Sequence, residues 1–179
     1  MAEDRDMKIY IGKAAREAND FRQISEEIEQ NRQNGNIERA QLLGERLARI
    51  KPDSGELGLD CTNMTAKELY RIRVLLTFTA EYIIQQSVKS EIVSDAVSSA
   101  MYSYLKTAEP GYYDNISDGS AFTFYLLALK KDGDTAHNIG EQFAKRCGTS
   151  SEEYVKLGAG IFCTASALFT DMINNVKFE

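Results

Sequence analysis

Apolar residues recur at spacings of three and four along nearly the whole chain, and this periodicity constrains the fold more than any other feature. Such spacing places apolar side chains on one face of an α-helix, whereas a half-buried β-strand alternates them every second residue. Turn residues are also scarce, since the 179 residues include only two prolines and twelve glycines. A β-sandwich or barrel needs more frequent turns, so the pattern predicts an all-α protein.

Helix breaks and capping residues divide the chain into seven expected helices. Thr65 with Glu68 three residues later has the form of a capping box, and Ser90, Thr135 and either Ser150 or Ser151 are the other expected N-caps. The expected helices cover residues 5–33, 37–50, 66–88, 91–107, 120–131, 135–146 and 151–176.

A chain of this length is typical of one domain. We expect a single all-helical domain over residues 1–179, built as a bundle or a short solenoid of antiparallel helical hairpins. It would consist of a charged N-terminal hairpin over 5–50 and a helical core over 64–179. The seam of the first helix has alanines where a strong coiled coil has leucines, which favours packing on the same chain over an arm that forms a homodimer.

Two expected helices have the apolar character of a core. Residues 66–88 are apolar on nearly all faces, and one narrow polar stripe at i+4 spacing consists of Arg73, Thr77, Glu81 and Gln85. Residues 157–170 form an uncharged stretch that is shorter than a membrane span, so we interpret it as a buried core helix of a soluble protein.

An internal similarity links two of the expected helices. Residues 43–49 match residues 139–145 position by position, which suggests a duplicated three-helix unit over 8–86 and 120–176, although amphipathic helices also resemble each other by chance. Ala40, Leu47 and Pro52 follow the spacing of small and proline positions in the second half of a tetratricopeptide repeat. That short stretch resembles the motif, and the resemblance implies a helical hairpin.

Charge and cysteine content restrict the partners and the compartment. The chain has a net charge of −6, and residues 81–120 contain two lysines against six acidic residues. Nucleic-acid binding normally requires a basic stripe, so we expect no nucleic-acid partner. The N-terminus has no apolar signal region, which predicts a cytoplasmic protein with reduced cysteines and no membrane association.

Patterns for metal or cofactor chemistry are incomplete. A calcium loop beginning at Asp114 lacks the required ligands at positions three and twelve, and the glycines of residues 158–163 lie inside a helix with no preceding strand. The three cysteines and His137 do not have the spacing of a zinc site. We therefore expect no catalytic residue, no metal and no cofactor.

Tyrosines and carboxylates gather in an expected loop over 109–120, where Tyr112, Tyr113, Asp114 and Asp118 form the candidate binding site. Tyrosines beside carboxylates suit a basic or peptide ligand, although tyrosines also cover core edges with their hydroxyls in water. The favoured function is a non-enzymatic module that binds a protein or peptide, with a homodimer as a possibility. The alternative is a small-molecule-binding or enzymatic helical domain that uses this loop and His137.

Overall fold

The computed structural model describes residues 21–179, and this part of the chain is helical without any β-strand, which confirms the all-α prediction. Residues 21–33 form a helix that precedes α2. The further helices are α2 (Asn36–Arg49), α3 (Ala66–Ser87), α4 (Glu91–Ala108), α5 (Pro110–Ile116), α6 (Thr123–Leu129), α7 (Thr135–Cys147) and α8 (Glu152–Asn174), with 3₁₀ turns at Gly55–Leu57 and Ser120–Phe122.

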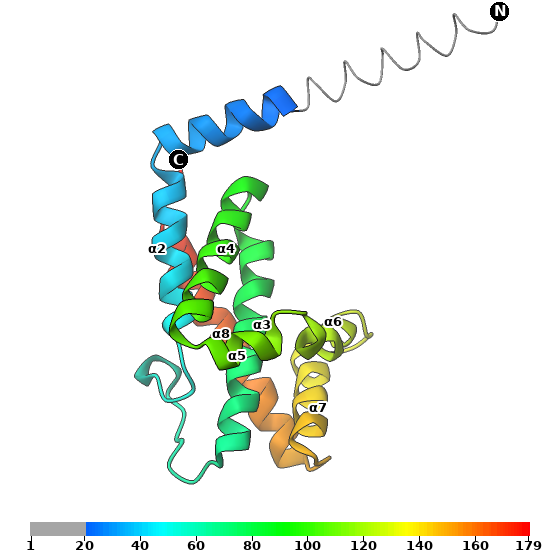
Figure 1. Ribbon diagram of the computed structural model, residues 1–179. Coiled ribbons are helices and arrows are strands. Elements are labelled where there is room, and N and C mark those ends of the chain that lie inside the picture. Colours follow the sequence, from blue (N-terminus) through cyan, green and yellow to red (C-terminus); the bar gives the residue numbers. More distant parts are fainter. Residues whose placement is uncertain (1–20) are drawn as a thin grey trace, which may run out of the picture.

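Helix α3 lies at the centre and contacts α4, α7 and α8, while α2 packs against α4 and α7 packs along α8 (Figure 1). The predicted capping box begins α3: Glu68 N donates to Thr65 Oγ1, and Thr65 N donates to Glu68 Oε2 at 2.7 Å. From Ile72 to Ala80 every side chain of α3 is buried, as its nearly all-round apolarity predicts.

Helix α8 contains the predicted core stretch. Among residues 21–179 it alone has the length and apolarity of a possible membrane span. Four of its apolar residues, Ile161, Phe162, Ala165 and Phe169, are buried in the core. This face of α8 therefore belongs to the core of the bundle.

The two helices with similar sequences, α2 and α7, each pack closely against a neighbour through a glycine. A Cβ placed on Gly44 of α2 would lie 2.3 Å from the Val97 carbonyl oxygen of α4, and one on Gly140 of α7 would lie 2.2 Å from the Val155 carbonyl oxygen of α8. Both glycines therefore let helix backbones approach more closely than any other residue would allow. The partner of α2 is α4 rather than α3, and the duplication of a whole three-helix unit stays a prediction.

Two local predictions were wrong, and one expected helix is shorter and less regular. The expected loop over 109–120 contains α5, which begins with Pro110, a residue favoured at the first helical position. The expected helix over 120–131 is a 3₁₀ turn followed by the shorter α6. The cap of α7 is Asp134 rather than Thr135, since the Asp134 carboxylate accepts from His137 N at 2.6 Å.

The first part of the expected N-terminal hairpin, residues 1–20, lies outside the described residues. The helix over 21–33 and α2 are joined by a turn at Gly35, which has a left-handed φ of 72°. The two helices point in different directions from this turn (Figure 1). Residues 21–33 therefore do not lie antiparallel along α2, and Phe21 and Ile24 are exposed.

Candidate functional site

The polar stripe of α3 lies beneath the tyrosine-rich segment 109–120 and beside it. Its first two members, Arg73 and Thr77, are buried. Helix α5 crosses α3 at this point and hydrogen-bonds to both of them. The last two members, Glu81 and Gln85, lie beyond α5 and line a groove.

Arg73 connects three segments of the chain. Its guanidinium donates to the Ala48 carbonyl oxygen at 2.6 Å, to the Ile50 carbonyl oxygen, and to Glu109 Oε1 at 3.0 Å. It thereby satisfies carbonyl groups at the end of α2, which have no partner within the helix. Because its side chain is only 7% exposed, these bonds are shielded from water and hold the start of α5 against α3.

Tyr112 attaches α5 to the same stripe. Its hydroxyl donates to the Arg73 carbonyl oxygen at 3.1 Å and lies 2.7 Å from Thr77 Oγ1. Burial raises the pKa of Tyr112 to about 12, and the hydrogen bond with Thr77 opposes this rise. The phenol is therefore neutral at physiological pH, and its role is to position α5.

A small pocket next to Tyr112, of about 330 Å³, has balanced charges. Lys51 and Arg73 stand against Asp53 and Glu109, and Lys51 Nζ lies 3.3 Å from Glu109 Oε1. The remaining lining residues are Pro52, Leu69, Tyr70 and Tyr112. Since its charged groups compensate one another, this pocket has no clear preference for a charged ligand.

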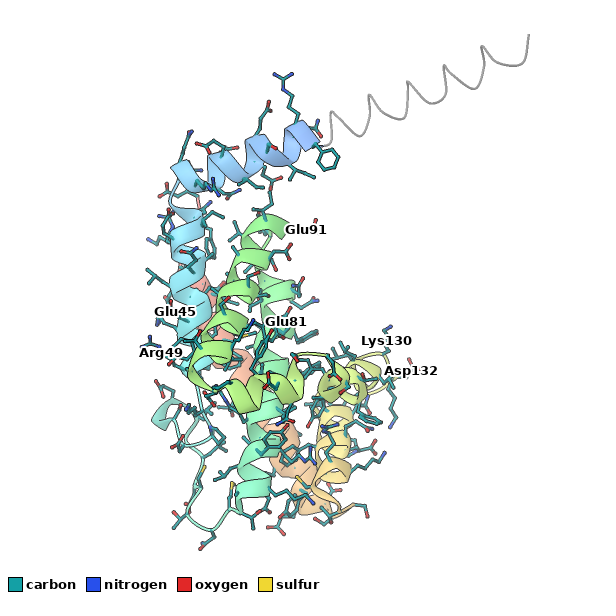
Figure 2. The ribbon with its side chains drawn as sticks, viewed as in Figure 1. Glu45, Arg49, Glu81, Glu91, Lys130 and Asp132 are labelled. Carbon is teal, nitrogen blue, oxygen red and sulfur yellow. The ribbon has the colours of Figure 1, made fainter. Side chains whose placement is uncertain are left out.

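The groove between α3, α4 and α5 has a different character, and we call it the acidic groove. It has a volume of about 580 Å³, and its lining consists of Glu81, Gln85, Asp95, Ser98, Ser99, Tyr102, Ser103, Tyr113, Ile116, Ser117, Gly119 and Phe122. Two carboxylates belong to this set, whereas no lysine or arginine of residues 21–179 does. Figure 2 shows Glu81 in the central part of the molecule.

Two polar atoms of the acidic groove lack partners. Glu81 Oε2 and Ser98 Oγ are buried and make no hydrogen bond within the described chain. Buried polar atoms are normally paired, so these two atoms can accept or donate to an incoming group. The other Glu81 oxygen only accepts a long bond of 3.4 Å from Gln85 Nε2.

Tyr102 and Tyr113 form the aromatic part of the acidic groove. Burial raises the pKa of Tyr102 well above its usual range, and the negative charge of Glu81 raises it further. Lys106 Nζ lies 6.0 Å from the Tyr113 ring centroid, within the range of a cation–π interaction.

The four residues of the predicted site go to different places. Tyr113 lines the acidic groove, whereas its neighbour Tyr112 faces α3 and the small pocket. Asp114 is exposed and lines neither cavity. Asp118 accepts from Ser120 N at 2.9 Å, and this hydrogen bond lowers the pKa of its carboxyl.

The carboxylates of the groove come from Glu81 and Asp95, and not from the predicted Asp114 and Asp118. Glu81 and Asp95 belong to the acidic segment 81–120, and the i+4 stripe on α3 was the signal that marked Glu81.

His137 does not join the predicted site. Its side chain is 52% exposed at the start of α7, where Nε2 lies 3.7 Å from Glu141 Oε1. It lines neither the acidic groove nor the small pocket. Within residues 21–179, no three His, Cys, Asp or Glu side chains gather as a metal site would require.

Comparison with protein-family models, curated proteins and solved structures finds no match to this chain.

Proposed function

We propose that this protein is a non-enzymatic interaction module that binds a basic segment of a protein or peptide partner in the acidic groove. The observation that carries the proposal is the composition of the lining, in which Glu81 and Asp95 are accompanied by no cation from residues 21–179. Opposite charge across an interface steers the encounter and fixes its register.

A lysine or arginine side chain has the chemistry that the groove lacks. Its N–H groups can donate to Glu81 Oε2, which is buried without a donor in the described chain. Charge-assisted hydrogen bonds of this kind are stronger than neutral ones. The ring of Tyr102 adds aromatic surface over which a cation is attracted, whereas the ring of Tyr113 already faces Lys106.

The lining also supports binding rather than catalysis. It contains carboxylates, hydroxyls and an amide, but none of the His, Cys or Lys residues of 21–179 that would provide a nucleophile or a base near neutral pH. The alternative function combines loop 109–120 with His137, and no hydrogen bond or ion pair among the described residues joins the two.

Location and oligomeric state are parts of the same proposal. All three cysteines lie within residues 21–179 and are free thiols, which fits a reducing cytoplasm. A second copy of the chain is a further candidate partner, because Phe21 and Ile24 expose apolar surface on the helix that turns away from α2.

The test is an NMR titration of the isotope-labelled chain with a tetra-arginine peptide, and with tetra-glutamate as the opposite charge. We expect tetra-arginine to shift the amide resonances of Glu81, Ser98, Tyr102 and Tyr113 in a saturable and salt-sensitive way. Tetra-glutamate should leave these resonances unchanged.

The matched variants are Glu81→Gln and Glu91→Gln, which remove the same charge from inside and outside the groove. Glu91 is the first residue of α4, one turn before Asp95, and does not line the groove (Figure 2). Glu81→Gln should weaken tetra-arginine binding roughly tenfold, as expected for one charged hydrogen bond. Equal weakening by both variants, or a lack of saturation, would mean general attraction to an acidic protein and would overturn the proposal.

A further inference from the structure

The small pocket beside Tyr112 has a largely apolar surface. Leu69 and Tyr70 of α3, Tyr112 of α5 and the buried Pro52 belong to its lining. The rings of Tyr70 and Tyr112 meet edge to face, with their centroids 6.0 Å apart. The volume of about 330 Å³ is in the range of cavities that bind small molecules. These residues therefore provide a surface for the apolar part of a ligand.

A tight turn brings two opposite charges to the same pocket. Ser54 N donates to the Lys51 carbonyl oxygen at 2.9 Å, and Lys51 N donates to Ser54 Oγ at 2.8 Å. Pro52 occupies the second position of this turn, where its fixed φ is favourable. The residues on either side of it, Lys51 and Asp53, both line the pocket.

These two charged groups remain available to a ligand. Glu109 is already engaged, because its Oε1 lies 3.0 Å from Arg73 Nη2 and 3.3 Å from Lys51 Nζ. Lys51 Nζ has three N–H donors, and Glu109 is its one ion-pair partner within residues 21–179. The Asp53 carboxylate is exposed and forms no ion pair or hydrogen bond with this part of the chain. The pocket thus has spare donors and one unpaired carboxylate.

Arg73 joins the walls of the pocket to one another. Its side chain also lines the pocket, is only 7% exposed, and donates to the carbonyl oxygens of Ala48 and Ile50 and to Glu109. Its Nε has no acceptor in the described chain. Because Glu109 directly precedes α5, these bonds fix Tyr112 relative to α3 before any ligand arrives. A site that is already ordered loses less free energy on binding.

We propose that the small pocket binds a free α-amino acid with a large apolar side chain. Such a molecule carries an ammonium and a carboxylate on the same carbon and has no net charge, which matches a pocket whose own charges are balanced. The ammonium donates to Asp53, and the carboxylate accepts from Lys51 on the side of the pocket that also has the positive charge of Arg73.

The apolar side chain of the amino acid lies against Leu69, Tyr70 and Tyr112 in this arrangement. A simple anion or a simple cation would satisfy only one of the two charged groups. The pocket shares no residue with the acidic groove, so the proposal is independent of the function proposed for that groove.

An NMR titration of the isotope-labelled chain with L-phenylalanine tests the proposal. We expect saturable shifts of the amide resonances of Leu69, Tyr70 and Tyr112. Three further ligands each lack one of the recognised groups: phenylalaninamide has no carboxylate, N-acetylphenylalanine has no ammonium, and glycine has no apolar side chain. Each of them should bind more weakly than L-phenylalanine.

Two substitutions assign the charged contacts. Asp53→Asn should weaken L-phenylalanine binding by about three- to tenfold, as expected for a partly exposed ion pair, without weakening the binding of N-acetylphenylalanine. Lys51→Gln should have the same effect on L-phenylalanine without weakening the binding of phenylalaninamide. Asp114→Asn and Lys130→Gln are the controls, because both residues are exposed, lie outside the pocket and lose the same charges.

Absence of saturable shifts with L-phenylalanine would overturn the proposal. Equal affinities for L-phenylalanine, phenylalaninamide and N-acetylphenylalanine would also overturn it, because the pocket would then select only an apolar ring. The same holds if Asp53→Asn and Lys51→Gln bind L-phenylalanine as tightly as the two control variants.

Discussion

The side-chain amide of Asn36 forms hydrogen bonds with both the backbone N–H and the backbone carbonyl oxygen of Glu179. Asn36 Nδ2 donates to the Glu179 carbonyl oxygen at 2.5 Å, and Glu179 N donates to Asn36 Oδ1 at 2.9 Å. Asn36 is buried and also donates to Asn31 Oδ1 at 2.8 Å. One side chain thus fastens the start of α2, the helix before it and the segment after α8 to one another.

Replacing Asn36 by Ala should release the segment 175–179. We expect the free energy of unfolding to fall by about 1–3 kcal/mol, because buried partners of Asn36 lose their hydrogen bonds. Hydrogen exchange at the Glu179 amide should become faster. Asn115→Ala is the control, since Asn115 is exposed and bonds only within α5 to the Gly111 carbonyl oxygen. Unchanged exchange at Glu179 in the Asn36 variant would contradict the role given to this clamp.

Three glycine-to-alanine variants test the close helix contacts. Gly44→Ala and Gly140→Ala should each lower the free energy of unfolding by about 1–3 kcal/mol, because the added methyl group would meet a backbone carbonyl oxygen. Gly160→Ala should instead raise it by about 0.5–1 kcal/mol, since a Cβ there has nothing within 4 Å and alanine favours the helix. Chemical denaturation measures all three, and the same sign for all of them would refute the distinction.

Two substitutions test the attachment of α5 to α3, one at Tyr112 and one at Arg73. Tyr112→Phe removes the hydrogen bonds to Thr77 and to the Arg73 carbonyl, and we expect a loss of about 0.5–1.5 kcal/mol in unfolding free energy. Arg73→Met leaves two carbonyl groups without their donor and should cost more, about 3–5 kcal/mol. Tyr113→Phe serves as the control because Tyr113 forms no hydrogen bond through its hydroxyl within the described chain. A ranking in which Tyr113→Phe exceeds Tyr112→Phe would disprove this arrangement.

Acid should weaken the start of α3 through Glu68. Hydrogen bonds from Thr65 and Tyr154 lower the pKa of Glu68 from the usual 4.5 to about 2. A depressed carboxyl pKa stabilises the fold above the unfolded-state value, so this contribution is complete above about pH 4.5 and is lost as the pH falls toward 2. Melting temperatures measured across this interval should fall less steeply in Glu68→Gln than in the parent chain. Parallel curves for the two proteins would show that Glu68 makes no such contribution.

Local signals in the sequence predicted the long helices well. The boundaries of α3, α4 and α8 follow from caps and apolar periodicity, because these features act within one helical turn. Helix α5 was missed because its seven residues are too few to be stable alone, and Arg73 and Thr77 hold it from a distant part of the chain.

The difference between local signals and contacts from distant parts of the chain also explains the outcome at the candidate site. The sequence indicated an acidic, tyrosine-rich region, but the meeting of Tyr113 with Glu81 and Asp95 depends on how three helices cross. The separation of Tyr112 from Tyr113 likewise follows from the docking of α5, which no spacing rule describes.

The way α5 is fastened has a consequence for motion. This helix is short, contributes one buried residue, Ile116, and is held largely by side-chain hydrogen bonds at its first half. Such an element is expected to open in a local unfolding event well before the bundle unfolds globally. Because Tyr113, Ile116 and Ser117 form one wall of the acidic groove, each opening of α5 also dismantles that wall. A ligand in the groove would therefore suppress the opening, and slower hydrogen exchange in α5 would report its occupancy.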